Sequence, residues 1–83
     1  MFYVYIVRCS DNTLYTGITT DLERRVQEHN RSKKGAKYTR SRRPVYLVYS
    51  CPVGSRSLAM REERRIKKLN KAQKLKLISQ KDN

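Results

Sequence analysis

The chain has 83 residues, a length that suits one domain over residues 1–83 with a single hydrophobic core. Its 20 Lys and Arg residues outnumber its 7 Asp and Glu residues, which gives a formal net charge of +13 at pH 7. No apolar run approaches the roughly 20 residues of a membrane span, and the apolar N-terminus is too short for a secretion signal. The two cysteines lack metal-ligand spacing and cannot form a disulfide scaffold, so we expect a cytoplasmic protein.

Positive charge gathers in two blocks of the sequence. Residues 24–43 and residues 61–81 hold nine basic residues each, whereas residues 1–23 hold one. Such a charge distribution attracts polyphosphates and exceeds what solubility requires of a small domain. We therefore expect a nucleic acid as the partner and no membrane, a membrane surface being a distant second.

The first part of the chain is typical of a β-hairpin. Two runs rich in β-branched and aromatic residues, 3–7 and 14–18, flank the turn-forming residues 10–13. Alternation places the tyrosines of the first run on one face, so Tyr5 lies on the opposite face from its aliphatic neighbours. Gly17, inside the second run, indicates a close approach by another group.

Helices and one more strand are expected after the hairpin. Thr20 and Glu23 have the spacing of a capping box that opens the first helix. A basic connector with room for a helical turn leads to a strongly apolar strand over residues 45–49. Two helices follow, one from Ser55 or Ser57 to about Leu69 and one from Asn70 onward, where Asn70 and Gln73 resemble a second capping box. The order β-β-α-β-α-α predicts an α/β protein of the α+β type, with a small three-stranded, mainly antiparallel sheet flanked by helices.

Glu62 is the most unusual residue of the long helix. At about 100° per residue, the apolar residues of 58–69 form one stripe, with Glu62 near its middle and Glu63 at its edge. A carboxylate on a core-facing row is costly unless it is paired or binds a metal. Periodicity alone leaves open a functional role and a salt bridge with Arg65 or Lys68.

Arg25 and His29 lie four residues apart on one face of the first helix. A permanent cation thus stands beside a group that titrates near neutrality. Alone, this pair is more simply interpreted as a histidine satisfied by the carbonyl groups at the helix C-terminus. The six tyrosines are likewise interpreted first as core aromatics, because a phenol becomes a useful base only beside a cation or a metal-bound water.

The order of these residues resembles the GIY-YIG nuclease pattern. The matching positions are Tyr3-Val4-Tyr5, Tyr15-Thr16-Gly17, Arg25, His29 and Glu62, with Lys37-Tyr38-Thr39-Arg40 also close to family usage. The resemblance covers nearly the whole chain and is strongest to small, stand-alone bacterial members (the YhbQ type). Tyr3 replaces the first glycine of the pattern and Thr16 replaces an isoleucine, but both functional tyrosines are kept.

The resemblance implies a metal-dependent endonuclease that acts on DNA, including structured or repair-intermediate DNA. Tyr5 and Tyr15 would flank the scissile phosphate, and one of them would act as the base or orient the attacking water. Arg25 would bind the phosphate and stabilise its developing charge, and His29 would orient or relay a proton. Glu62 would hold a single divalent cation, Mg²⁺ or Mn²⁺.

The expected nucleic-acid contacts lie in the first basic block and are Arg24, Lys33, Lys34, Lys37, Tyr38, Arg40, Arg42 and Arg43. DNA is the expected partner, although the sequence does not distinguish it from RNA. No protein partner is evident, and we expect a monomer or a weak dimer. Two alternatives stay open: a non-catalytic basic module that binds DNA or RNA through phosphates, and a small ribosome-associated or structural protein.

Overall fold

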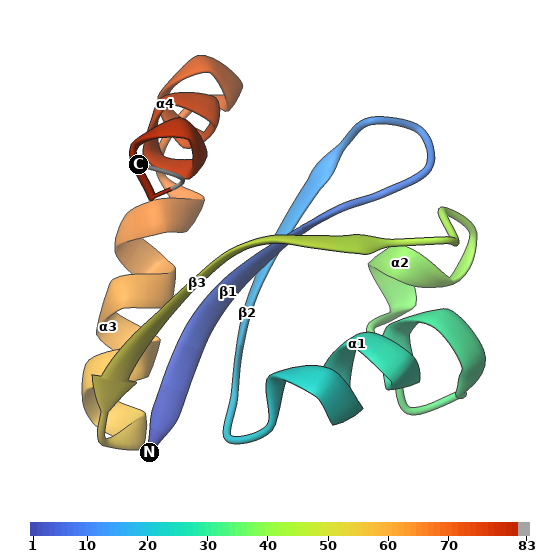
Figure 1. Cartoon of the computed structure of the whole chain (residues 1–83), viewed down its shortest axis with the longest axis horizontal. Coiled ribbons are helices and arrows are strands. Elements are labelled where there is room, and N and C mark those ends of the chain that lie inside the picture. Colours follow the sequence, from blue (N-terminus) through green and yellow to red (C-terminus); the bar gives the residue numbers. More distant parts are fainter. Residues whose placement is uncertain (82–83) are drawn as a thin grey trace.

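The computed structural model of the protein describes residues 1–81, which form three strands and four helices (Figure 1). The strands are β1 (Phe2–Arg8), β2 (Leu14–Thr19) and β3 (Tyr46–Gly54). The helices are α1 (Leu22–Arg31), α2 (Lys37–Arg40), α3 (Arg56–Lys67) and α4 (Lys71–Lys81). All strand pairs are antiparallel in the order β2-β1-β3, so the predicted fold is confirmed, with α2 as the helical turn in the basic connector.

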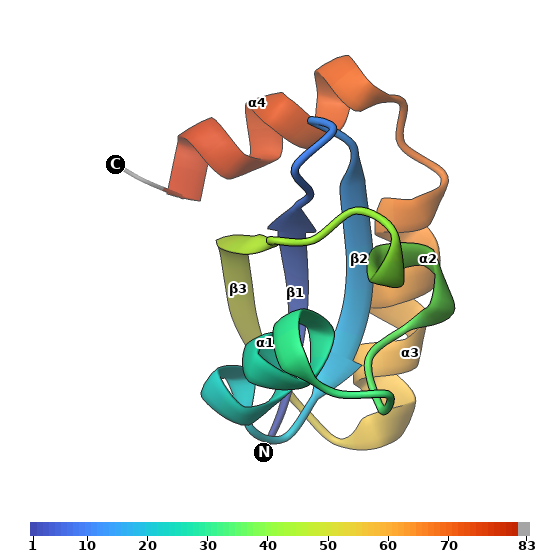
Figure 2. The same ribbon diagram turned by 90° about the vertical axis from the view of Figure 1, so that its right-hand side faces the viewer.

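Helices cover both faces of the sheet (Figures 1 and 2). On one face, Val4 and Ile6 of β1 pack with Ile66 of α3, and side chains of α4 extend this cluster. On the other face, Tyr5 and Val7 of β1 form a second cluster, against which apolar side chains of α1 pack. The alternation of β1 therefore sends Tyr5 toward α1 and its aliphatic neighbours toward α3, as the sequence predicts.

The most apolar strand of the sequence lies at an edge of the sheet, not at its centre. Strand β3 extends through Pro52 to Gly54, and its Tyr46 and Leu47 side chains are 54% and 41% exposed. Proline is tolerated in edge strands because one side of the strand needs no backbone donor. Strand β1 takes the central position and pairs with both neighbours, which is why its residues 4–7 are all buried.

Two capping predictions have different outcomes. Helix α1 is capped by Asp21, whose Oδ1 accepts from the Arg24 backbone N–H at 3.0 Å, so the predicted Thr20 cap is wrong. Thr and Asp are both good N-caps, and here α1 begins at Leu22, directly after Asp21. The predicted box at α4 is confirmed: Asn70 Oδ1 accepts from the Gln73 N–H at 2.8 Å, and Gln73 Oε1 accepts from the Asn70 N–H at 2.9 Å.

No helix in the described part of the chain is both long and apolar enough to cross a membrane.

Candidate active site

A buried hydrogen bond joins β1 to α1. The Tyr5 hydroxyl oxygen lies 2.7 Å from Nε2 of His29, and their side chains are 1% and 0% exposed. The two rings meet edge to face, with their centroids 5.8 Å apart. The third turn of α1 thus places a histidine over a central-strand tyrosine that precedes it by 24 positions.

Gly17 makes room for this tyrosine. It pairs with Tyr5 across the β1–β2 ladder, and a Cβ atom built on Gly17 would lie 2.6 Å from the Tyr5 hydroxyl oxygen. A side chain at this position would therefore collide with the phenol ring. The prediction that Gly17 marks a close approach is confirmed, and the approaching group is the ring of Tyr5.

Arg25 is the cation beside Tyr5 and His29. Its Nε donates to the Tyr5 hydroxyl oxygen at 3.4 Å, and its Nη1 donates to Glu28 Oε1 and to the Lys34 carbonyl oxygen, each at 2.9 Å. The side chain is 24% exposed. No bond within residues 1–81 uses Nη2, so one end of a rigidly held guanidinium can still bind an incoming anion.

The proton positions follow from the second bond of His29. Nδ1 lies 2.9 Å from Thr39 Oγ1, and Thr39 Oγ1 donates to the Ala36 carbonyl oxygen at 2.9 Å. The Ala36 backbone N–H also points at Nδ1, at the longer distance of 3.4 Å. We assign the proton of neutral His29 to Nδ1, because the shorter contact is to the Thr39 oxygen, which can accept this proton while giving its own hydrogen to the Ala36 carbonyl oxygen. Nε2 is left as an acceptor for the Tyr5 hydroxyl.

Burial sets the charge states of this pair. Burial, followed by the charge of Arg25, lowers the pKa of His29 to about 4, so the imidazole is neutral at pH 7. Burial also raises the pKa of Tyr5 to about 12, against the opposing influence of the Arg25 hydrogen bond. In the free protein the phenol therefore keeps its proton and donates it to His29.

Tyr15 lies between His29, which its ring meets edge to face, and Tyr38, on which its ring stacks. Its ring centroid is 5.4 Å from that of His29, and its other side stacks on Tyr38 at 5.8 Å. The Arg42 guanidinium carbon lies 4.1 Å from the centre of the Tyr38 ring, and Arg42 Nε donates to Asp11 Oδ2 at 2.9 Å. The structure therefore brings Tyr5, Tyr15 and His29 together, as predicted for the tyrosines of neighbouring strands.

The predicted nucleic-acid contacts divide into two groups. Three arginines use their guanidinium groups within the protein: Arg40 donates to the Lys33 carbonyl oxygen, Arg42 binds Asp11, and Arg43 donates to two carbonyl oxygens at the end of α1. Tyr38 stacks on Tyr15 and lies under the Arg42 guanidinium, but it is still 40% exposed. The exposed cations that remain for a ligand are Lys33, Lys34 and Lys37, together with Arg24, whose Nε lies 3.9 Å from Glu28 Oε2.

Helix α3 places Glu62 and Glu63 on opposite flanks of its buried stripe. Ala59 and Ile66 are fully buried, whereas Leu58 is 46% exposed, so the stripe is narrower than the sequence suggests. With about 100° between successive residues, each glutamate lies about 50° from the centre of the Ala59–Ile66 stripe. The two carboxylates therefore point to different sides of α3.

The structure does not place Glu62 beside Tyr5, Arg25 and His29. Its Oε1 accepts from Arg65, and it is one of the charges that act on Tyr49, which packs with Ile66 on the α3 face of the sheet. The acidic group of α3 whose charge reaches Tyr5 is Glu63, which also pairs with Lys67 Nζ at 3.3 Å. The sequence placed Glu63 at the edge of the apolar stripe because Leu58, which is exposed in the structure, was counted as part of that stripe.

No group of three His, Cys, Asp or Glu side chains among residues 1–81 could hold a metal ion by itself. Mg²⁺, however, is commonly bound by one or two carboxylates, with water and substrate phosphate oxygens as its other ligands. Glu63 is a partly exposed carboxylate within electrostatic reach of the Tyr5 hydroxyl. The donor set therefore fits a cation that is completed by the substrate.

The model of the GIY-YIG catalytic domain matches residues 1–76. The chain therefore belongs to the GIY-YIG family, a nuclease-type family that acts on nucleic acids. It is 58% identical over 78 residues to a UPF0213 protein of Syntrophus aciditrophicus (strain SB), covering 94% of this chain and 90% of that one. It is 53% identical over 79 residues to the UPF0213 protein YhbQ of Escherichia coli (strain K12), covering 95% and 78% of the two chains.

Solved structures agree with this assignment. The solution NMR structure of the UPF0213 protein BH0048 from Bacillus halodurans superimposes with a TM-score of 0.62 at 48% identity. It covers 98% of this chain and 86% of the other. The solution NMR structure of EF2693 from E. faecalis gives the same TM-score and coverage at 39% identity. Family and fold are thus established.

Proposed function

We propose that the protein is an endonuclease that hydrolyses phosphodiester bonds in DNA with the help of one divalent cation. The observation that carries this proposal is the buried bond between the Tyr5 hydroxyl and His29, with Arg25 donating to the same hydroxyl oxygen. A protein that only coats nucleic acid needs surface cations, but it has no use for a phenol, an imidazole and a guanidinium joined in this way.

Arg25 binds the scissile phosphate in this proposal. Its Nε and Nη1 atoms are fixed by Tyr5, Glu28 and the Lys34 carbonyl, and its free Nη2 end is partly exposed. A guanidinium held in advance can stabilise the negative charge that develops on the phosphate without reorganising during the reaction. The remaining exposed cations of the first basic block, Lys33 and Lys34 among them, bind neighbouring phosphates.

Tyr5 and His29 activate the attacking water. As the water oxygen bonds to phosphorus, its proton passes to the Tyr5 oxygen while the Tyr5 proton passes to His29 Nε2. The bond to the leaving oxygen breaks, and solvent protonates that oxygen. A bound phosphate offsets the charge of Arg25, one cause of the low His29 pKa, so substrate binding makes His29 a better proton acceptor. Tyr15, held beside His29, orients the water or the phosphate.

Glu63 takes the role that the sequence analysis gave to Glu62. It would hold Mg²⁺ or Mn²⁺ through its carboxylate, with water and phosphate oxygens as the other ligands. When bound, the cation supplies positive charge that offsets the charge of the transition state. Glu62 is instead proposed to serve as an ion-pair partner of Arg65 on the other flank of α3.

The two neighbouring glutamates provide a matched test. The protein, Glu63→Gln and Glu62→Gln are incubated with supercoiled plasmid and with nicked and branched duplexes, in Mg²⁺, in Mn²⁺ and in EDTA. We expect cleavage by the unchanged protein and by Glu62→Gln, and loss of cleavage by Glu63→Gln and in EDTA. Thermal melting of all three proteins checks that each is folded.

Other outcomes contradict the proposal in distinct ways. Absence of cleavage by the folded, unchanged protein on every substrate would support the binding-module alternative. Cleavage that survives Glu63→Gln but is lost in Glu62→Gln would return the metal-binding role to Glu62.

A further inference from the structure

Helix α3, which runs into the second basic block, carries cations that form no bond within the described part of the protein. Within residues 1–81, the guanidinium groups of Arg56, Arg61 and Arg64 on α3 form no hydrogen bond or ion pair. Arg65 and Lys67 of the same helix are paired with glutamates. The first block differs, because several of its arginines are bound to carbonyl oxygens or to Asp11.

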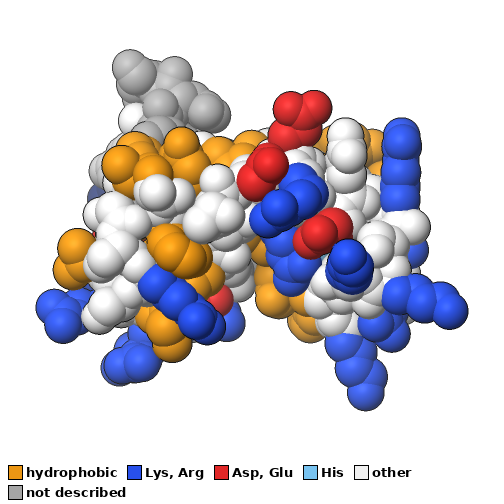
Figure 3. Space-filling view, turned by 90° about the horizontal axis from the view of Figure 1, so that it is seen from below, with side chains coloured by type: hydrophobic (Ala, Val, Ile, Leu, Met, Phe, Trp, Pro, Cys, Tyr) orange, Lys and Arg blue, Asp and Glu red, His pale blue; other side chains and the backbone are white. Residues whose placement is uncertain are grey.

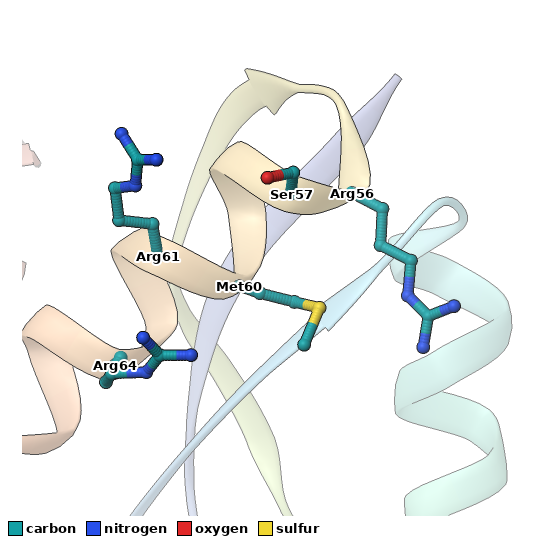
Figure 4. Close-up of a pocket in the computed structure, with 5 residues that line it drawn as sticks. All are labelled: Arg56, Ser57, Met60, Arg61 and Arg64. Carbon is teal, nitrogen blue, oxygen red and sulfur yellow. The ribbon is translucent and has the colours of Figure 1, made fainter.

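These three arginines form one surface that begins beside Glu63. Successive helical residues are about 100° apart, which places Arg56 next to the Glu63 flank, then Met60 and Arg64, and Arg61 farther round. Figure 4 shows Arg56 and Met60 pointing to the side on which β2 and α1 are seen, while Arg61 extends away from it. We call Arg56, Arg61 and Arg64 the α3 arginine face.

The surface between these side chains is hollowed. Arg56, Ser57, Met60, Arg61 and Arg64 line an open depression of about 650 Å³. One water molecule takes up about 30 Å³ in the liquid, so the depression is far larger than a single small ion requires. Its three separated guanidinium groups suit an extended ligand with several negative charges.

Basic side chains also lie on both sides of a notch in the molecule. Seen from below in Figure 3, two lobes are separated by a notch, and Lys and Arg side chains project from both lobes in the same direction. The left lobe contains α3 and the right lobe contains α1, as in Figure 1. A polyanion whose reacting phosphate lies at Arg25 would therefore meet further cations on the α3 side.

We propose that the α3 arginine face binds the phosphate backbone of the nucleic-acid substrate on the side of the scissile phosphate that faces Glu63. This inference rests on the proposed function and extends it from one reacting phosphate to a binding surface made of two helices. Guanidinium groups without internal partners lose no existing bond when they bind phosphate, unlike Arg42 or Arg43. None of the residues that line the depression carries a carboxylate that would compete with phosphate for these arginines.

The test compares two double variants of equal net charge. Arg56→Ala with Arg64→Ala removes part of the α3 arginine face, and Lys74→Ala with Lys76→Ala removes two charges from α4. Helix α4 lies beyond the C-terminal end of α3, away from Arg56 (Figures 1 and 2). Binding of a short fluorescent DNA duplex is measured by anisotropy across a salt series in EDTA, so that the result does not depend on cleavage.

For each phosphate contact, the slope of log K against log[salt] changes by about 0.9 on duplex DNA. We expect the α3 double variant to lose close to two such contacts, and the α4 double variant to lose less than one. Equal losses in both variants would overturn the inference, because they would show a general charge effect. Failure of the unchanged protein to bind the duplex would also overturn it. If the unchanged protein binds the duplex, with the expected loss of contacts in the α3 double variant, but cleaves no DNA in Mg²⁺ or Mn²⁺, only the proposed function is contradicted.

Discussion

The hydroxyl of Tyr5 lies 2.7 Å from Nε2 of the buried His29, and the partly exposed Arg25 donates to the same hydroxyl oxygen. This contact ties the central strand to α1, and it also sets the charges of the site. The phenol stays protonated and the imidazole stays neutral because both charged forms are disfavoured by burial. The same bond therefore contributes to stability and to the proposed chemistry, and its two roles can be separated by mutation.

Tyr5→Phe removes the hydroxyl and keeps the ring. We expect cleavage to be lost, because the proposed water-activating oxygen is gone. We also expect destabilisation of about 1–3 kcal/mol, because Nε2 of His29 is left buried without its donor. Urea unfolding and plasmid cleavage measure the two effects. Retention of full activity by a destabilised Tyr5→Phe protein would assign Tyr5 to the fold alone.

His29, the one histidine of the chain, predicts a specific acid sensitivity. Its pKa is about 4 in the folded protein against an ordinary value of 6.5. Between these values the unfolded chain binds more protons, so stability falls as the pH is lowered from about 6.5 to about 4. Below pH 4 both states are protonated and this loss is complete. The full shift corresponds to roughly 3 kcal/mol.

The measurement is the free energy of urea unfolding at several pH values, for the unchanged protein and for His29→Asn. We expect the variant to lack the slope between pH 4 and 6.5, whatever its stability at pH 7. An equal slope in both proteins would show that carboxylates, and not His29, cause the acid sensitivity.

The sequence predicted which face of the sheet Tyr5 lies on, but not the order of the strands within the sheet. Alternation in β1 correctly separated Tyr5 from its aliphatic neighbours, because the side-chain period of a strand is fixed by backbone geometry. The central position of β1 could not be inferred in this way. The sequence predicts a strongly apolar strand at 45–49, yet Tyr46 and Leu47 are 54% and 41% exposed at the sheet edge. Strand order depends on pairing between distant segments, which hydropathy does not encode.

The site shows the same division between local and long-range information. Arg25 and His29 share a helix face, and the four-residue spacing was enough to place them together. Which glutamate lies nearer to the centre of the buried stripe of α3 depends instead on whether Leu58 belongs to that stripe. The packing of α3 on the sheet leaves Leu58 46% exposed, so the sequence alone placed Glu62 too close to the centre. Arg42 is a similar case, because its partner Asp11 lies 31 positions earlier in the chain.

Gly17→Ala should be destabilising because of the Tyr5 ring. The added Cβ would lie 2.6 Å from the hydroxyl oxygen and 2.8 Å from Cζ of that ring, so the ring must move. In a Tyr5→Ala background the obstacle is absent, and the second substitution should cost much less. We therefore expect a double-mutant cycle measured by chemical unfolding to give a clear coupling energy between Tyr5 and Gly17. Additive effects would place the cost in the β2 backbone instead.

Two pairs of cations within the first basic block should behave differently although each pair carries two charges. Lys33 and Lys34 are exposed, whereas Arg42 binds Asp11 and Arg43 binds carbonyl oxygens at the end of α1. Replacing both lysines by alanine should weaken DNA binding and reduce its salt slope by about 1.8, since each lost phosphate contact contributes about 0.9. The melting temperature should change little, because neither lysine side chain supports the fold.

Replacing Arg42 and Arg43 by alanine should have the opposite result. The loss of their internal bonds should lower the melting temperature, because Arg42 holds the ring of Tyr38 against Tyr15 and Arg43 satisfies carbonyl groups at a helix end. The salt slope of binding should change less than in the lysine variant. Conservative Arg42→Lys and Arg43→Lys changes keep the charge but lose the planar fork, so they should also lower stability. A normal melting temperature together with a strongly reduced salt slope would show that these two arginines release their internal partners to bind phosphate.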